Sequence, residues 1–453
     1  MILVMSNTGE FSPILHKVQQ EGGQGVIYLH NPRYRENYDG ILEKVKLTQL
    51  KMAHKKADKV IFDITRPNER YRSDPDPEMI KRDAALLTMF GLKSSERSVF
   101  GPVADVMKQD SDVIGCSRFS EDAELDRMLG FKIAKQIGLK VPESHEFQNF
   151  KEGVKFLEAH QQDLWICKPQ ENEGFTYMES WEGELLAKMQ GEWLEKCKKP
   201  WPFILQKLLP KTSVEIDFEG FFDGRRFTRT TYTMEEKFFQ TGSWSMQIGC
   251  QNTIVWGNQF PGLLSNALEK MIPFLLAAKH KGWVNITAMV NSDTKAIEWL
   301  EATFRAGYDA IFANLALAED TITNLIYSDF RGRFKDGYAA AERITIPPFP
   351  YSNPEMLKKI AAGVEIKNDM DRTLWFWMED VKKTKDGRLV CAGADGILGV
   401  VTHVGKTIEE AANGVYAKVK RLKIAAKIQL RTDLGKRAQR HIPRLKEWGF
   451  QAR

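Results

Sequence analysis

Cysteines are few in this sequence, and long apolar runs are missing. The five cysteines are scattered over 453 residues, with no Cys-x-x-Cys pair and no Cys/His cluster. A disulfide framework and a structural zinc site both need closer spacing, so we expect neither. No stretch reaches the roughly 18 uncharged apolar residues of a transmembrane helix. The apolar start, Met1 to Met5, is too short for a signal peptide and lacks its basic residues. These absences predict a soluble protein of the cytoplasm, with no membrane partner.

An excess of one charge is missing as well. The 65 basic residues are nearly balanced by 60 acidic ones, for a net charge of +5, which is not typical of a dedicated nucleic-acid binder. The balance is uneven near the C-terminus, where Lys418 to Lys446 contains eleven Lys and Arg and a single acid, Asp433. A solvated helix face is the simpler explanation of this run. A surface that faces a polyanion such as nucleic acid is the alternative.

What is present is the composition and patterning of a multidomain globular protein. At roughly 100–200 residues per domain, the chain should form two to four domains. Apolar runs at Ile2–Met5, Val26–Leu29 and Lys59–Asp63 predict short buried strands. Helix-like stretches such as Ile41–Ala53 lie between them, and this alternation favours a parallel sheet covered on both faces. We therefore expect an N-terminal α/β domain over residues 1–118.

The remainder predicts two further domains with mixed α+β structure. A helix is expected over Glu121–Ile137, ended by Gly138. The alternating stretch from Glu215 to Asp223-Gly224 predicts a hairpin. A proline-rich segment at Ile346–Tyr351 is a natural domain boundary. We expect a central domain over 119–345, with a small lobe at about 165–235, and a C-terminal α+β domain over 346–453.

Two groups of polar residues stand where a sheet could present them to a ligand. Lys168 ends an apolar strand, a position suited to a phosphate contact, although an ordinary strand-end lysine explains it too. Glu301, Thr303 and Arg305 alternate, so an extended chain turns them to one face. A carboxylate there could hold magnesium with phosphate oxygens, and an arginine could stabilise a transferring phosphoryl group. A solvent-facing strand with an ion pair is the alternative.

The order of these features resembles the ATP-grasp family, and more narrowly phosphoribosylamine–glycine ligase, also called glycinamide ribonucleotide synthetase. The similarity is scattered but extends over nearly the whole chain. The matching segments are Phe100–Pro102, Gly138–Pro142, Trp165–Lys168, Glu301–Gly307, Asp395–Ala411 and Arg431–Arg437. The last two are the most specific, because they lie in the family's order at the very C-terminus.

The resemblance implies two lobes that hold ATP and Mg²⁺ between them, and it assigns roles to residues. Lys168 and Arg127 would contact the ATP phosphates, Glu215 would bind the ribose, and the segment Gln206, Lys207 and Leu208 would form the hinge beside the base. Glu301 and Thr303 would hold the metal. Arg305, with Lys168, would act in catalysis on an acyl phosphate. Substrate loops would lie at Asn7, Thr8 and Gly9 and at Thr241 and Gly242.

The sequence departs from the family at functional positions. The family's opening loop, Gly-Asn-Gly-Gly-Arg-Glu-His, is replaced by Ser6–Ser12, in which Glu10 would repel a phosphate. The loop after Lys168 has a single glycine, Gly174, and so offers fewer backbone N–H groups to phosphates. Thr303 replaces an asparagine and is a weaker magnesium ligand.

We therefore expect an ATP-dependent carboxylate–amine ligase that forms an amide through an acyl phosphate. Its carboxylate substrate would be an amino acid, possibly glycine, and its amine acceptor would differ from phosphoribosylamine. A true phosphoribosylamine–glycine ligase is one alternative. A non-catalytic homologue that binds a nucleotide or DNA, through the basic C-terminal surface, is the other.

Overall fold

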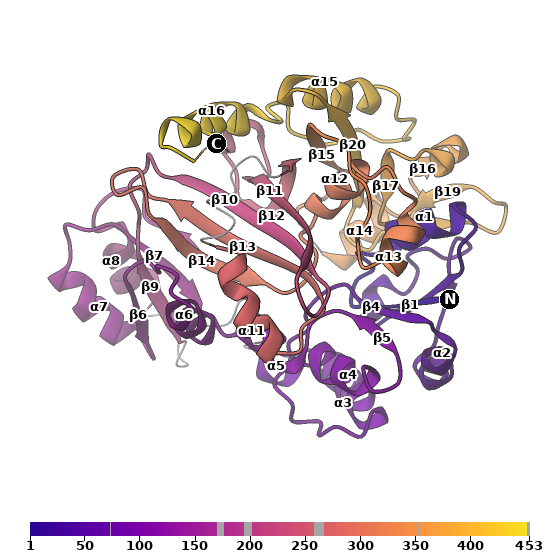
Figure 1. The fold of residues 1–453 in the computed structure, drawn as a ribbon, viewed down its shortest axis with the longest axis horizontal. Helices are drawn as coiled ribbons and strands as arrows, with labels where there is room; N and C mark the ends of the chain where they lie inside the picture. Colours follow the sequence, from indigo (N-terminus) through magenta and orange to yellow (C-terminus); the bar gives the residue numbers. More distant parts are fainter. Residues whose placement is uncertain (73, 170–175, 194–201, 258–266, 352, 451–453) are drawn as a thin grey trace.

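The computed structural model describes residues 1–72, 74–169, 176–193, 202–257, 267–351 and 353–450. Within these ranges the strands form sheets of five, four, eight and three strands. Figure 1 shows the large sheet at the centre, a smaller lobe on one side, the N-terminal domain on the other and the C-terminal helices above. None of the described helices is long and apolar enough to cross a bilayer.

The N-terminal domain is built on a parallel sheet, as the buried apolar runs predict. Its strand order is β3-β2-β1-β4-β5, and β1, β2 and β4 are buried along their whole length. Burial on both faces explains why these strands are almost entirely apolar. The elements are β1 (Ile2–Ser6), α1 (Ser12–Gln20), β2 (Gly25–Leu29), β3 (Glu43–Lys44), α2 (Leu50–Lys56), β4 (Lys59–Phe62), α3 (Pro77–Met89), α4 (Phe100–Met107) and β5 (Asp112–Ile114).

The predicted helix over Ile41–Ala53 is wrong. Glu43–Lys44 instead form the edge strand β3, which pairs with Val26 and Ile27 of β2, and α2 begins only at Leu50. Local helix propensity is a weak preference, and the hydrogen bonds offered by the open edge of a sheet can override it.

The predicted helix over Glu121–Ile137 is two helices, α5 (Arg118–Leu125) and α6 (Arg127–Gln136). Asp126 lies between them with an extended backbone, and its side chain accepts the N–H of Leu129 at 3.0 Å. This is an N-cap interaction, which begins a new helix. The break places Arg127 in the first turn of α6, where its side chain can reach the large sheet. Gly138 follows α6 with φ of +78°, as expected for a helix C-terminus.

The small lobe has a sheet and a hydrophobic core of its own. Its antiparallel strand order is β6-β9-β7-β8, and its core includes Phe150, Leu157, Trp165, Leu185 and Phe203. The elements are β6 (Ser144–Phe147), α7 (Phe150–Ala159), β7 (Trp165–Pro169), β8 (Tyr177–Met178), α8 (Glu184–Lys188) and β9 (Phe203–Lys207).

The large sheet carries most of the remaining chain. Its strand order is β14-β13-β10-β11-β12-β15-β20-β17, and all its pairs are antiparallel. The predicted hairpin is confirmed, because β10 and β11 pair around Asp223-Gly224. The sheet includes strands from both sides of Ile346, where the boundary between the central and C-terminal domains was predicted. The predicted domain boundaries therefore stay predictions. The strands are β10 (Val214–Phe222), β11 (Phe227–Phe238), β12 (Gln247–Trp256), β13 (Gly282–Val290), β14 (Ile297–Thr303), β15 (Tyr338–Thr345), β17 (Phe376–Met378) and β20 (Ile397–Gly405).

Helices and a small sheet cover this framework. The helices are α11 (Ile272–Ala277), α12 (Ala310–Ala316), α13 (Ile322–Tyr327), α14 (Pro354–Ile360), α15 (Ile408–Val419) and α16 (Lys436–Glu447). The three-stranded sheet consists of β16 (Glu365–Ile366), β18 (Val381–Lys383) and β19 (Leu389–Cys391). Short helical turns occur at Pro32–Tyr34, Leu47–Gln49, Glu69–Tyr71, Met189–Trp193, Thr241–Ser243, Glu269–Met271 and Asn368–Arg372.

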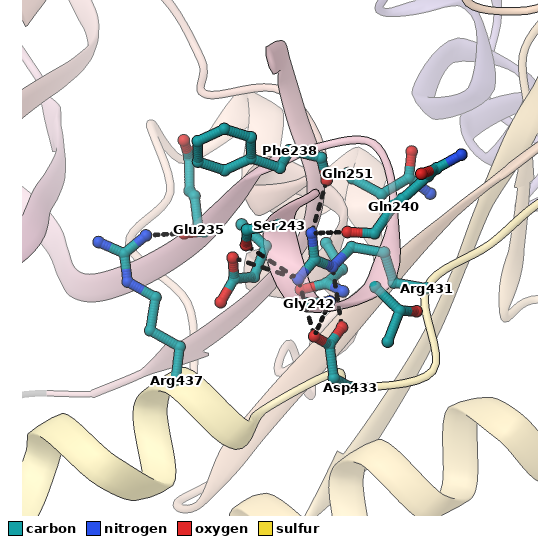
Figure 2. Close-up of polar contacts among 12 residues, drawn as sticks. Glu235, Phe238, Gln240, Gly242, Ser243, Gln251, Arg431, Asp433 and Arg437 are labelled. Atoms are coloured by element: carbon teal, nitrogen blue, oxygen red, sulfur yellow. Dashed lines mark hydrogen bonds and ion pairs between the residues drawn. The ribbon is translucent and has the colours of Figure 1, made fainter. Parts of the chain in front are cut away.

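Arg431 ties the C-terminal segment to the end of β11 (Figure 2). The side chain is fully buried, and its guanidinium donates to the carbonyls of Phe238 at 2.8 Å and Gln240 at 2.6 Å. It also donates to both carboxylate oxygens of Asp433, each at 2.8 Å. Because Asp433 stands just before α16, this cluster places that helix beside the large sheet.

Replacing Arg431 with methionine should destabilise the protein by about 3–5 kcal/mol. The substitution takes the donor from the carbonyls of Phe238 and Gln240 and removes the cation from Asp433, which keeps the N–H of Gly242 as a donor. The measurement is chemical or thermal unfolding, with Lys420→Met, at an exposed position, as the matched control. Unfolding that is the same for both variants would contradict the anchoring role.

Candidate functional site

One large cavity lies where the small lobe, the large sheet, the N-terminal loop and α16 meet. Its volume is about 1410 Å³. Most of the residues that the sequence singled out line it: Thr8, Gly9, Arg127, Lys168, Gln206, Lys207, Leu208, Glu215, Gly242, Glu301, Thr303 and Arg305. Asn7 and Thr241 do not line it. The loop from Glu171 to Gly174 lies outside the described residues.

Lys168 is the buried cation of the small lobe. It lies near the end of β7 with its side chain turned into the cavity, and it is only 9% exposed. Burial, and then the neighbouring charge of Arg127, lower the pKa of Lys168 to about 8. The ammonium group therefore lacks a sufficient counter-charge, and an anion bound in the cavity would supply it.

Glu301 faces this cation from β14. Arg127 donates to its carboxylate at 3.1 Å. Burial raises the pKa of Glu301, but Arg127, Lys237 and Lys168 outweigh burial and lower it to about 2. The carboxylate is therefore ionised at neutral pH.

Thr303 and Arg305 continue the same wall. Arg305 donates through Nε to Glu124 at 3.0 Å, and its guanidinium carbon lies 5.6 Å from the ring centre of Tyr308. Glu124 also accepts the N–H of Phe304 at 2.7 Å. The contacts with Glu124 and Tyr308 orient the guanidinium of Arg305. Its other two nitrogens are available to a ligand in the cavity.

Glu215 is held by two cations on opposite sides. Lys237 donates to one carboxylate oxygen at 2.7 Å and Arg437 to the other at 3.0 Å. Burial opposes ionisation, but the two cations hold the pKa of Glu215 well below its usual range. A ribose hydroxyl bound to Glu215 would have to share this carboxylate with Lys237 and Arg437.

The hinge segment offers a buried acceptor. The side chain of Gln206 is almost fully buried, and its Oε1 has no hydrogen-bond partner among the described residues. The N–H groups of Lys207 and Leu208 donate to carbonyls within the small lobe, each at 2.8 Å. An unpaired buried oxygen is costly unless a ligand donates to it, and the amino group of adenine is such a donor.

The described residues suit a cation that is shared with phosphate. They include no group of three or more His, Cys, Asp or Glu arranged around a metal. Mg²⁺ commonly takes only one or two protein carboxylates, with phosphate and water oxygens completing its octahedron. Glu301 uses Oε2 for Arg127, and its Oε1 makes no hydrogen bond in the described ranges. With the hydroxyl of Thr303 beside it, this oxygen fits a magnesium ion bound together with a nucleotide.

The end of the cavity at the N-terminal domain is acidic. Glu10 accepts from Ser6 at 3.1 Å and also from Thr8. Asp395 and Glu379 line the same end. Burial and the charge of Asp380 raise the pKa of Asp395 to about 7, and burial raises that of Glu379 well above its usual range. These raised pKa values mean that Glu379 is protonated and Asp395 partly protonated at neutral pH. The Glu10 carboxylate is the group at this end that repels a phosphate and attracts an ammonium group.

Sequence reasoning missed several residues of the cavity wall. Asp217, Glu235, Lys237 and Arg437 line it beside Glu215. A signal existed for the first three, because the two-residue alternation in β10 and β11 turns them to the face that carries Glu215. Arg437 lies in the Arg431–Arg437 segment that resembles the family, but nothing in that segment showed that its side chain would reach Glu215.

Replacing Lys168 with methionine should stabilise the ligand-free protein at neutral pH by about 1–3 kcal/mol, because it removes a buried, poorly balanced charge while keeping most of the volume. The lysine pKa is about 8 in the folded chain against 10.5 ordinarily. The cost of its charge is therefore full below pH 8 and disappears as the pH rises through 10.5.

Thermal unfolding at pH 7 and pH 9.5 measures this gain, which should be smaller at pH 9.5. Lys155→Met, on the exposed face of α7, is the matched control. A loss of stability at pH 7 in the Lys168 variant would contradict the assigned charge imbalance.

Comparisons with known proteins found structures similar over nearly the whole chain, but no match by sequence. No protein-family model matches this chain, and no curated protein matches it. Phosphoribosylamine–glycine ligase from Thermotoga maritima is similar in structure, with a TM-score of 0.66 at 14% identity over 95% of this chain and 99% of that one.

Two further similar structures are biotin carboxylase from Campylobacter jejuni and N5-carboxyaminoimidazole synthetase from Staphylococcus aureus. The first has a TM-score of 0.59 at 11% identity, over 95% of this chain and 92% of that one. The second has a TM-score of 0.54 at 11% identity, over 92% and 97%. All three are ATP-grasp enzymes. The chain therefore has the ATP-grasp fold over nearly its whole length, as the resemblance predicted.

Proposed function

We propose that this protein is an ATP-dependent ligase that joins a carboxylate to an amine. The observation that carries this proposal is the convergence of Lys168, Arg127, Glu301 and Arg305 on one cavity between two lobes. Arg127 comes from α6, Lys168 from β7, and Glu301 and Arg305 from β14 and the residues that directly follow it. Together they provide cations for phosphates and an ionised carboxylate for a metal.

The nucleotide would lie between the small lobe and the large sheet. Gln206 accepts from the amino group of adenine, and Glu215 accepts from a ribose hydroxyl in competition with its present cations. Lys168 and Arg127 contact the phosphates. Glu301 and Thr303 would hold Mg²⁺, which when bound would supply charge neutralisation at the phosphates.

The reaction would proceed in two steps. The substrate carboxylate attacks the γ-phosphorus, which forms an acyl phosphate and releases ADP. The amine then attacks the acyl carbon, and inorganic phosphate leaves as the amide forms. Arg305, oriented by Glu124, stabilises the negative charge that develops on the acyl oxygen.

The acidic end of the cavity would receive the amine. The Glu10 carboxylate attracts an ammonium group, and Asp395, with a pKa of about 7, can take the proton that the amine must lose before it attacks. The same charges disfavour phosphoribosylamine, whose phosphate would meet Glu10 in place of the family's arginine.

Replacing Glu301 with glutamine should lower ADP release by at least 100-fold and weaken the dependence on magnesium. The amide keeps the volume but cannot neutralise a metal ion. The measurement is ADP release from ATP and Mg²⁺ in the presence of a panel of amino acids. Glu298→Gln, on the same strand and outside the cavity, is the control. Full activity in the Glu301 variant would refute the metal assignment.

Acceptor choice is a separate prediction. In the same assay with glycine and other amino acids as donors, unphosphorylated amines should raise ADP release more than phosphoribosylamine does. Exchanging Glu10 for glutamine should narrow this difference, because it removes the repulsion of phosphate. Preferred use of phosphoribosylamine by the unaltered protein would show that it is a true phosphoribosylamine–glycine ligase.

A further inference from the structure

The face of α16 that lines the cavity is strongly basic. Ala438, Ile442 and Leu445 are buried beneath the helix. The opposite side carries residues at helical spacing that line the cavity: Lys436, Arg437, Arg440, His441 and Arg444. An amphipathic helix ordinarily turns its charged face to bulk water. Here most of that face borders the cavity.

Most of these cations have no carboxylate partner. Within the described ranges, Lys436, Arg440 and Arg444 form no ion pair, whereas Arg437 is engaged with Glu215 at 3.0 Å. Arg444 contacts only the ring of Trp448, 5.4 Å from its centre. The three charges are therefore available to an external anion, and they repel one another until one binds.

His441 adds no charge to this face. Burial, and then Arg437, Arg440 and Arg444, lower the pKa of the imidazole to about 4. The ring is therefore neutral at physiological pH, and the positive charge of the face is carried by the arginines and Lys436.

The helix is held at both ends along the cavity. At its start, Asp433 accepts the N–H of Gly242 at 3.0 Å, and Thr432 donates its N–H to Thr241 at 2.9 Å. After its last turn, Trp448 lies beneath the ammonium group of Lys295, 4.3 Å from the ring centre. The helix thus runs from the loop between β11 and β12 to the turn between β13 and β14 (Figure 1).

An exposed aromatic residue stands at the first of these ends. Trp244 is 89% exposed, and Met246, two residues on, is 50% exposed. Both belong to the loop whose residues Gly242 and Ser243 line the cavity. The loop that carries this indole is held to the start of the basic helix by the contact of Gly242 with Asp433. An exposed aromatic ring together with a row of cations suits single-stranded nucleic acid, which binds through base stacking and phosphate contacts.

The cavity is also larger than one nucleotide needs. Its volume of about 1410 Å³ exceeds the roughly 300–1,000 Å³ of common small-molecule sites. After ATP is bound, room remains for a second ligand of substantial size.

We propose that the basic face of α16, with Trp244, binds a single strand of nucleic acid along the mouth of the cavity. Lys436, Arg440 and Arg444 contact successive phosphates, and Trp244 stacks on a base. As the substrate of the ligase this strand would present the amine, and that part of the inference rests on the proposed function. The binding itself does not.

The test is fluorescence anisotropy of a labelled 12-nucleotide single strand at several salt concentrations, without ATP. The unaltered protein should bind with an affinity that falls steeply with salt. The double variant Arg440→Ala/Arg444→Ala should lower the slope of log K against log salt by about 1.4, since each phosphate contact to a single strand contributes about 0.7. Trp244→Ala should weaken binding roughly tenfold.

The control is Lys55→Ala/Lys56→Ala on α2, which removes the same charge from an exposed helix of the N-terminal domain and should leave the slope unchanged. Thermal unfolding and ATP binding show that each variant is folded. Glu301→Gln should bind the strand normally, so that a failure of the ligase chemistry is distinguishable from a failure of strand binding.

Three outcomes would overturn the proposal. The first is no binding of the strand at low salt by protein that binds ATP. The second is an equal loss of slope in the α2 control. The third is competition by inorganic phosphate as effective, per phosphate, as an unlabelled strand, which would show a site for one phosphate group. Equal binding of duplex with no effect of Trp244→Ala would refute the stacking contact.

Discussion

The site depends on the balance of buried charges in one cavity. Lys168, Arg127 and Lys237 bring positive charge to the wall of the cavity, where burial disfavours charged groups, and Glu301 and Glu215 oppose it. Burying only the positive or only the negative charges would cost too much desolvation free energy. Because the positive charge of Lys168 is not fully compensated by neighbouring carboxylates, the site favours the binding of an anion. A bound nucleotide must replace some of these ion pairs, so their strength affects the affinity of the site for the nucleotide.

The two ends of the cavity have opposite charge, which constrains its substrates. The N-terminal end, at Glu10, Glu379 and Asp395, is acidic and favours an amine. The wall formed by α16 is basic and favours phosphates. In a single enzyme these preferences are compatible with an acceptor that is anionic along its length and cationic at its reactive end. The similar solved structures share the fold, at 10–14% identity.

Much of the fold was predictable because buried strands and strand faces require a recognisable spacing of apolar residues in the sequence. The strands of the parallel sheet are apolar throughout, and the hairpin at Asp223-Gly224 alternates and ends in a turn dipeptide. Errors arose in two ways, through a contact made elsewhere in the fold and through a local cap that the helical pattern hid. The helix expected over Ile41–Ala53 became an edge strand because β2 offered hydrogen bonds. The helix expected over Glu121–Ile137 broke at Asp126 because its side chain caps a new one.

By itself, then, the sequence pointed to Lys168 and to the Glu301-x-Thr303-x-Arg305 strand as candidate site residues, since alternation and strand ends are local properties; that they carry the chemistry is our proposal. Only the tertiary structure decided what surrounds them. Glu124, which orients Arg305, is distant in the chain, and Arg437 meets Glu215 across more than 200 residues. Charges act through space, and no spacing along the chain reveals which partner a fold will bring near.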